Sequence, residues 1–233
     1  MAGSWACFKL HAAPWYREPS VTLTTSRLAP RLGSVDAEQD RRHFDRWAPR
    51  YDRSLLQSLL FSPTHVAALN GASDAGAHPR EVLDLGCGTG RLLERAAERW
   101  PDAHFIGVDV APQMIAEARK KHTGDIRFRF EVGDAAALPL EPASIDVAFS
   151  TISFHHWADQ LSGVRQVARV LRPGGLFVLA DIRPMLLLLP VMRRFHGSRS
   201  RQRLFKDGGL TVVEQRRPLR LGGYVLVTVG RKP

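Results

Sequence analysis

The chain is poor in cysteine and in long apolar runs. Its 233 residues include two cysteines, Cys7 and Cys87, which are too few and too far apart for a disulfide framework or a metal-ligand motif. The default compartment for such a chain is a reducing cytoplasm. The longest aliphatic run, MLLLLPVM at residues 185–192, is interrupted by Pro190 and falls short of the roughly 18 apolar residues that span a bilayer. The sequence therefore predicts a soluble protein with no transmembrane segment.

Acidic residues are scarce at the C-terminal end. Residues 183–233 contain twelve Lys and Arg but only Asp207 and Glu214 as acids, so this segment alone accounts for the net charge of +10. A cationic surface attracts phosphates, which leaves nucleic acid open as a partner. Arginine outnumbers lysine 28 to 5, as a GC-rich genome also produces, so the charge by itself identifies no partner.

Acids are also scarce in residues 1–35, where Glu18 is the exception. This stretch is scattered with Pro, Ser, Thr and Gly and sustains no period, which predicts a disordered or weakly ordered tail. An Arg-bearing, acid-poor N-terminus also fits an organellar transit peptide, and a later translation start is a further alternative.

From residue 36 the pattern becomes helical. Phe44, Trp47 and Tyr51 recur at a spacing of three or four residues, which predicts an amphipathic helical segment over residues 36–70. The Gly- and Asp-containing stretch at 70–79 predicts a loop.

Beyond that loop, strand and helix patterns alternate. Apolar runs predict strands at 81–85, 104–109, 127–132, 145–150, 176–181, 210–215 and 223–229. Amphipathic spacing predicts helices at 90–100, 112–121 and 158–171. Such alternation indicates an α/β fold whose seven-stranded, mostly parallel sheet has helices on both faces. A short Gly-containing link joins the last two strands, so the final strand is expected to be antiparallel.

The first predicted strand runs into a glycine-rich turn. In EVLDLGCGTG, Gly86, Gly88 and Gly90 follow the apolar run at every second position. Ligands of open parallel sheets bind beyond the carboxyl ends of the strands, and glycines let the backbone approach them. A side chain at any of these positions is therefore expected to push the ligand away. Asp109 ends the next strand 19 residues after Gly90, close to the spacing of a carboxylate that binds ribose hydroxyls.

The same turn excludes two common ligand classes. It lacks the G-x-G-x-x-G spacing of dinucleotide-binding proteins, and Arg91 follows Gly90 where a P-loop has Lys-Ser/Thr. The carboxylate of Asp109 could accept from both vicinal hydroxyls but would repel a 2′-phosphate, so the predicted ligand has a free ribose.

Four motifs together resemble those of the class I S-adenosylmethionine (SAM)-dependent methyltransferases. LDLGCGTG, GVDVAPQMIAEAR, VGDAAALPLEPASIDVAFS and ARVLRPGGLFVLADI follow one another in the family's order over residues 81–182. The resemblance implies a Rossmann-like fold, SAM as cofactor and S-adenosylhomocysteine as product. It implies the following cofactor-binding residues: Asp84, Gly86, Gly88, Gly90, Asp109, Asp134, Ala135, Thr151 and Tyr51.

The resemblance also implies roles and boundaries. Asp134 and Ala135 are expected to face the adenine. FHHW and FDRWAPRYD are similar to the subgroup that includes the ubiquinone and menaquinone C-methyltransferases, in which Tyr51 would cover the methionine end of SAM. The chain would then divide as follows: a tail at 1–35, a methyltransferase domain at 36–233 with a lid at 36–70, a SAM-binding core at 81–182 and a basic region at 183–233 that completes the sheet.

Several of these residues have a simpler interpretation. Asp109 could cap a strand end, Gly133–Asp134 is also an ordinary turn pair, and Cys87 fits a small core residue better than a nucleophile.

Candidates for catalysis follow the fourth predicted strand. Methyl transfer from SAM depends mainly on positioning, and a base is needed only when the acceptor must lose a proton. Histidine accepts protons near neutral pH, so His155 or His156 in STISFHHWAD is the candidate base. The alternative is that both only shape the site. Neither forms a metal motif.

The acceptor is predicted to be a small organic molecule, with O-, C- and N-methylation left open. The apolar block at 185–192 could line a pocket for a lipophilic acceptor or touch a membrane surface. Alternatively, the whole stretch 183–209 could be a buried helix followed by a solvated charge run. An RNA methyltransferase that uses the basic C-terminal region is one alternative, although the NPPY-type motif of amino-group methylation is absent. A SAM-binding protein without catalysis is another. The oligomeric state is left open.

Overall fold

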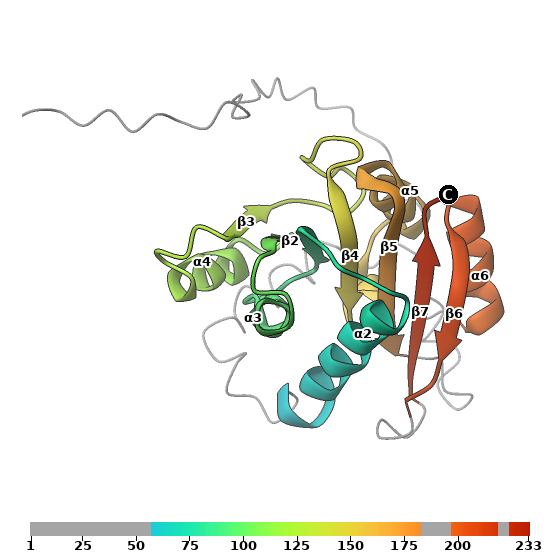
Figure 1. Ribbon diagram of the computed structural model, residues 1–233, viewed down its shortest axis with the longest axis horizontal. Helices are drawn as coiled ribbons and strands as arrows, with labels where there is room; N and C mark the ends of the chain where they lie inside the picture. Colours follow the sequence, from blue (N-terminus) through green and yellow to red (C-terminus); the bar gives the residue numbers. More distant parts are fainter. Residues whose placement is uncertain (1–56, 183–196, 219–223) are drawn as a thin grey trace, which may run out of the picture. The chain divides into compact units, whose positions relative to one another are not determined.

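The computed structural model describes residues 57–182, 197–218 and 224–233. Their strands form one seven-stranded sheet in the order β3-β2-β1-β4-β5-β7-β6 (Figure 1). Six strands are parallel, and β7 is antiparallel to both of its neighbours. The strands are β1 (Glu81–Leu85), β2 (His104–Asp109), β3 (Phe128–Val132), β4 (Ile145–Thr151), β5 (Leu171–Ile182), β6 (Thr211–Arg216) and β7 (Val225–Arg231). The predicted fold class and the antiparallel last strand are confirmed.

The sheet has its switch point at β1. The chain adds β2 and β3 on one side of β1 and then returns to place β4 on the other side. The crevice between the carboxyl ends of β1 and β4 is where such sheets bind ligands. The glycine-rich turn that follows β1 therefore lies at this point, because β1 ends at Leu85.

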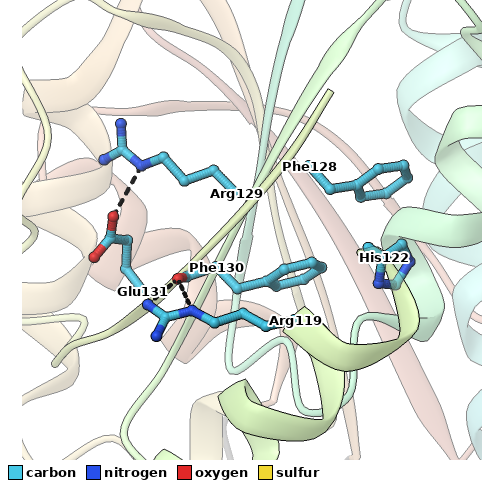
Figure 2. Close-up of a pocket in the computed structure, with 6 residues that line it drawn as sticks. All are labelled: Arg119, His122, Phe128, Arg129, Phe130 and Glu131. Atoms are coloured by element: carbon cyan, nitrogen blue, oxygen red, sulfur yellow. Dashed lines mark hydrogen bonds and ion pairs between the residues drawn. The ribbon is translucent and has the colours of Figure 1, made fainter. Parts of the chain in front are cut away.

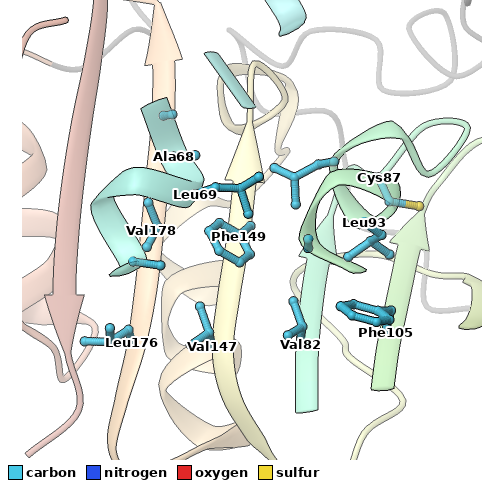
Figure 3. Close-up of a cluster of buried hydrophobic side chains, with 14 of the residues drawn as sticks. Ala68, Leu69, Val82, Cys87, Leu93, Phe105, Val147, Phe149, Leu176 and Val178 are labelled. Carbon is cyan, nitrogen blue, oxygen red and sulfur yellow. The ribbon is translucent and has the colours of Figure 1, made fainter. Parts of the chain in front are cut away.

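Helices cover both faces of the sheet. The first face packs against α2 (Ser62–Asp74), α3 (Arg91–Arg99) and α4 (Pro112–Lys121), and the second against α5 (Gln160–Val170) and α6 (Ser198–Asp207). Figure 3 shows the first core, in which Leu69 of α2 and Leu93 of α3 lie over Phe149 and Phe105 of the strands. Each large apolar side chain that is fully buried contributes about 1.5–3 kcal/mol.

The helix α2 corrects one prediction. It continues to Asp74, through residues for which the sequence predicted a loop. Gly71 packs closely here: a Cβ would lie 3.3 Å from Arg216 Nη2 and 3.4 Å from the side chains of Val227 and Val229. The low helix propensity of glycine is a weak predictor, which tertiary contacts routinely override. Contact with β7 therefore keeps this Gly- and Ala-containing turn helical.

The helix α6 also differs from what the sequence suggested. No helix was predicted here, and one of the interpretations left open was a solvated charge run, yet Arg201 and Phe205 are buried. Arg201 donates from Nη1 to the carbonyl of Leu226 at 2.5 Å and from Nη2 to the carbonyl of Asp181 at 3.0 Å. A guanidinium has five donors in a fixed fork, so it can join the end of β5 to the start of β7.

Several predictions lie outside the described residues. These are the tail, the contacts of Phe44, Trp47 and Tyr51, and the apolar block at 185–192. The domain boundaries stay predictions. In the described ranges, no helix is long and apolar enough to cross a membrane.

We expect His65 of α2 to make folding sensitive to acid. Burial, with the nearby cations of Arg95 and Arg91, lowers the pKa of His65 to about 3. The unfolded chain therefore binds the extra proton first, and stability is lost as the pH falls from about 6.5 towards 3, by about 1.4 kcal/mol per pH unit. Between pH 7 and 5, urea unfolding should show wild type losing about 2 kcal/mol relative to His65→Gln. The same difference at both pH values would contradict this expectation.

Candidate active site

The glycine loop, residues 86–90, has an unusual backbone. Gly86, Gly88 and Gly90 have φ values of 70°, 53° and 85°, a region that other residues rarely adopt. A Cβ on Gly86 would lie 2.4 Å from the Cβ and Oγ of Ser153, and one on Gly90 would lie 3.0 Å from the ring of Phe130. A side chain at either position would therefore meet protein atoms first, and the close approach of a ligand to these glycines stays a prediction.

Asp109 holds this loop. Its Oδ2 accepts a hydrogen bond from the backbone N–H of Gly88 at 2.8 Å, and its Oδ1 accepts one from Ala111 at 2.9 Å. The capping contacts that the sequence left open are thus present, and they place the carboxylate beside the glycine loop. Its contact with a ribose stays a prediction.

Asp84 is the most unusual group of the site. It is 1% exposed, and none of the described residues bonds to its Oδ1. Burial, and next the negative charge of Asp109, raise the pKa of Asp84 to about 8. Buried polar atoms are nearly always hydrogen-bonded. This oxygen therefore fits a ligand that donates a hydrogen bond there, as the amino group of SAM would.

Cys87 lies between these two acids along the chain and is 7% exposed. Burial, followed by the charges of Asp109 and Asp84, raises the pKa of its thiol well above the usual value. A thiol that keeps its proton is a poor nucleophile. The geometry favours the small core residue that the sequence suggested.

The remaining cofactor candidates lie at the same edge of the sheet. Asp134 accepts a hydrogen bond from the N–H of Ala136 at 2.9 Å, which is the turn contact left open by the sequence. Ala135 is 8% exposed, and Thr151, the last residue of β4, is 6% exposed. Their contacts with SAM stay predictions, as does that of Tyr51, which lies outside the described residues.

The residues after β4 connect it to the glycine loop. Ile152 has a φ of 49°, a strained value for a β-branched residue. Such strain persists only where the surroundings fix it, and it is common at active sites. Here Ser153 Oγ donates to the carbonyl of Leu85 at 2.9 Å and lies 2.9 Å from Ser150 Oγ. Neither Ile152 nor Ser153 was predicted from the sequence as part of the site.

His155 follows on η2 (Phe154–His156) and is oriented by Asp181 at the end of β5. Its Nδ1 lies 2.8 Å from Asp181 Oδ1, and its backbone N–H donates to Oδ2 at 2.9 Å. A carboxylate oxygen accepts hydrogen bonds, so this contact favours the tautomer in which Nδ1 donates to Asp181. The two side chains are 12% and 2% exposed. The ring of His156 lies beside that of His155, with centroids 4.0 Å apart.

A cavity of about 300 Å³ lies elsewhere, at the β3 edge of the sheet (Figure 2). Arg119 donates from Nε and Nη2 to the carbonyl of Phe130 at 3.0 and 2.6 Å. This carbonyl belongs to an edge strand, and covering such groups protects a sheet from unwanted pairing. The cavity contains none of the predicted site residues.

In the described part of the chain, no cluster of His, Cys, Asp or Glu could hold a metal ion.

This arrangement defines a class of protein. A seven-stranded sheet with an antiparallel β7, a glycine loop after β1 and an acid at the end of β2 is the arrangement expected of a class I methyltransferase. Residues 82–175 match the family model described as a methyltransferase domain. This part of the chain is thus a methyltransferase domain of the class I SAM-dependent family, as its motifs predicted.

Individual relatives agree with this assignment. The chain is 39% identical over 139 residues to a demethylmenaquinone methyltransferase of Deinococcus radiodurans, covering 59% of this chain and 57% of the relative. It is 35% identical over 160 residues to a malonyl-[acyl-carrier protein] O-methyltransferase of Xylella fastidiosa, covering 67% and 52%. The chain thus spans little more than half the length of these curated relatives.

A solved structure extends the likeness over more of the fold. The Haloferax volcanii protein solved in complex with the Trm112 methyltransferase activator matches with a TM-score of 0.69 and 26% identity, covering 82% of this chain and 97% of that one.

Proposed function

We propose that the protein transfers a methyl group from SAM to a small organic acceptor, with His155 as the general base. The observation that carries this proposal is the hydrogen bond of 2.9 Å from Ser153 to the carbonyl of Leu85. Ser153 precedes His155 by two residues, and Leu85 precedes the glycine loop directly. The candidate base is therefore attached to the candidate cofactor loop.

Different residues at the carboxyl edge of the sheet would bind different parts of SAM. Asp84 would accept from its ammonium group, Asp109 would accept from its ribose hydroxyls, and the glycine loop would lie against its methionine end. Asp134 and Ala135 would contact the adenine. When bound, SAM supplies an electrophilic methyl group on a sulfonium leaving group.

His155 would remove the acceptor proton. Its Nδ1–H is held by Asp181, whose carboxylate also accepts from the backbone N–H of Ile182 at 2.7 Å. These contacts orient the ring, and Nε2 would be the atom that accepts the proton from the acceptor. A positioned base contributes about 10²–10⁴-fold to the rate when a proton must leave. This role fits an acceptor hydroxyl or an acidic carbon, and the acceptor atom is part of the proposal to be tested.

The relatives named for demethylmenaquinone and for malonyl-[acyl-carrier protein] act on different acceptors. Both names support a small organic group as acceptor. The RNA alternative has less support, because several C-terminal cations are used within the fold. Arg216 contacts Asp74 at 2.6 Å, and Arg231 donates to the carbonyl of Ala75 at 3.0 Å. Arg201 is buried.

The cofactor part of the proposal is tested at Asp109. Asp109→Asn keeps the shape of the side chain but removes its charge, and a charge-assisted hydrogen bond contributes about 1.5–3 kcal/mol. We expect SAM affinity to fall about 10- to 100-fold in titration calorimetry. Glu131→Gln, which removes an acid on neighbouring β3, serves as the control. Unchanged affinity in a folded Asp109→Asn protein would count against the binding site.

A further inference from the structure

Three ionisable side chains lie close together at the carboxyl ends of β1 and β2. Asp84, Cys87 and Asp109 interact electrostatically, and the first two are almost fully buried. A buried carboxylate needs hydrogen-bond donors or a cation to remain charged at low cost. Oδ1 of Asp84 is a buried carboxyl oxygen to which none of the described residues donates a hydrogen bond.

The groups packed nearby do not supply that cation. On the same face of the sheet, His65 of α2 interacts with Arg95 and Arg91 of α3, and it stays neutral at physiological pH because its pKa is about 3. Asp109 adds negative charge from β2, and the Cys87 thiol keeps its proton. Among the described residues, the environment of Asp84 therefore favours the neutral carboxyl group. The raised pKa of Asp84 agrees with this, since a group with a pKa of about 8 is mostly protonated at pH 7.

We propose that Asp84 carries a proton in the cofactor-free protein and releases it to solvent when SAM binds. The inference rests on the proposed function and concerns the coupling of that site to pH. The ammonium group of SAM would donate to Oδ1 and place a positive charge beside the carboxyl group. An opposite charge at close range favours the ionised form, so the O–H bond of Asp84 breaks heterolytically and the proton leaves for water. No other bond changes.

The coupling predicts a measurable proton count. Titration calorimetry of the full chain with SAM at pH 6.5, in buffers of different ionisation enthalpy, gives the number of protons released. At this pH the amino group of SAM is already charged, as α-amino groups titrate near pH 8. We expect about one proton per SAM bound, and an affinity that rises about tenfold per pH unit between pH 5.5 and 7.

Two variants separate this coupling from other titrations. Asp84→Asn imitates the neutral carboxyl group, so it should release no proton, and its affinity should not change with pH over this range. Asp102→Asn removes an exposed carboxyl group between α3 and β2 and should keep the wild-type count. If Asp84→Asn does not fold, the wild-type count and its pH dependence still decide the matter.

The outcomes distinguish the two proposals. SAM binding with a release of one proton, lost in Asp84→Asn, supports the coupling. SAM binding with no proton exchange overturns the coupling and leaves the proposed function standing. Absence of SAM binding by wild type overturns both. A proton release that persists in Asp84→Asn assigns the titration to another group and overturns the inference.

Discussion

Replacement of His155 by alanine is expected to lower kcat by about 10²–10⁴-fold, the usual contribution of a positioned base. SAM affinity should change little, because His155 is proposed to face the acceptor rather than the cofactor. His156→Ala is the matched control: its ring lies 4.0 Å from that of His155, and most activity should be retained. Single-turnover kinetics with saturating SAM would measure the effect. Full activity of His155→Ala would remove the base from the mechanism.

Asp181 is proposed to act through His155, so its effect is measured on the tautomer of His155 as well as on kcat. Asp181→Asn removes the charge that holds the hydrogen on Nδ1, so kcat should fall by about 10–100-fold, as for other residues that orient a functional histidine. Nitrogen NMR of labelled histidine should show the Nδ1–H tautomer of His155 in wild type and a mixture in the variant. A variant with lower activity but an unchanged tautomer would mean that Asp181 is only structural.

The second large effect is expected at Gly86. Gly86→Ala must accommodate both a positive φ and a Cβ placed 2.4 Å from Ser153. The backbone conformation costs about 1–2 kcal/mol, and the overpacking adds about 1–3 kcal/mol. Ser153 would have to give up its bond to Leu85, so SAM binding should weaken as well.

Gly76→Ala separates these two costs. Gly76 has a φ of 82°, and a Cβ there would meet no atom within 4 Å. It should lose the backbone contribution alone and bind SAM normally. Equal losses in urea unfolding for Gly86→Ala and Gly76→Ala would contradict the packing argument.

The sequence predicted the sheet well because its central strands are buried on both faces. Such strands are continuous apolar runs bounded by Gly, Pro or acids. Six strands lie within two residues of the expected positions, while β5 starts at Leu171, five residues earlier than predicted. The errors fall where packing between distant segments decides. Gly71 looks like a loop residue until β7 lies against it, and Arg201 looks solvated until its donors reach the carbonyls of Asp181 and Leu226.

The site was predicted less completely, for a related reason. Asp84, Asp109 and the glycines could be found because the spacing between neighbouring elements is read directly along the chain. Asp181 was missed as a partner of His155, from which it is separated by 26 residues. One signal was available: Asp181 follows the apolar run LFVLA, as Asp109 follows the apolar residues of β2. The left-handed conformation of Ile152 has no sequence signal of its own.

The central claim is methyl transfer from SAM to a small organic acceptor. It is tested most directly by incubating the protein with methyl-labelled SAM and a fractionated extract of the organism that encodes it. We expect label in the solvent-extractable small-molecule fraction, and much less label there when His155→Ala replaces the wild-type protein. Label confined to RNA or protein, or no transfer to any fraction by a protein that binds SAM, would contradict it.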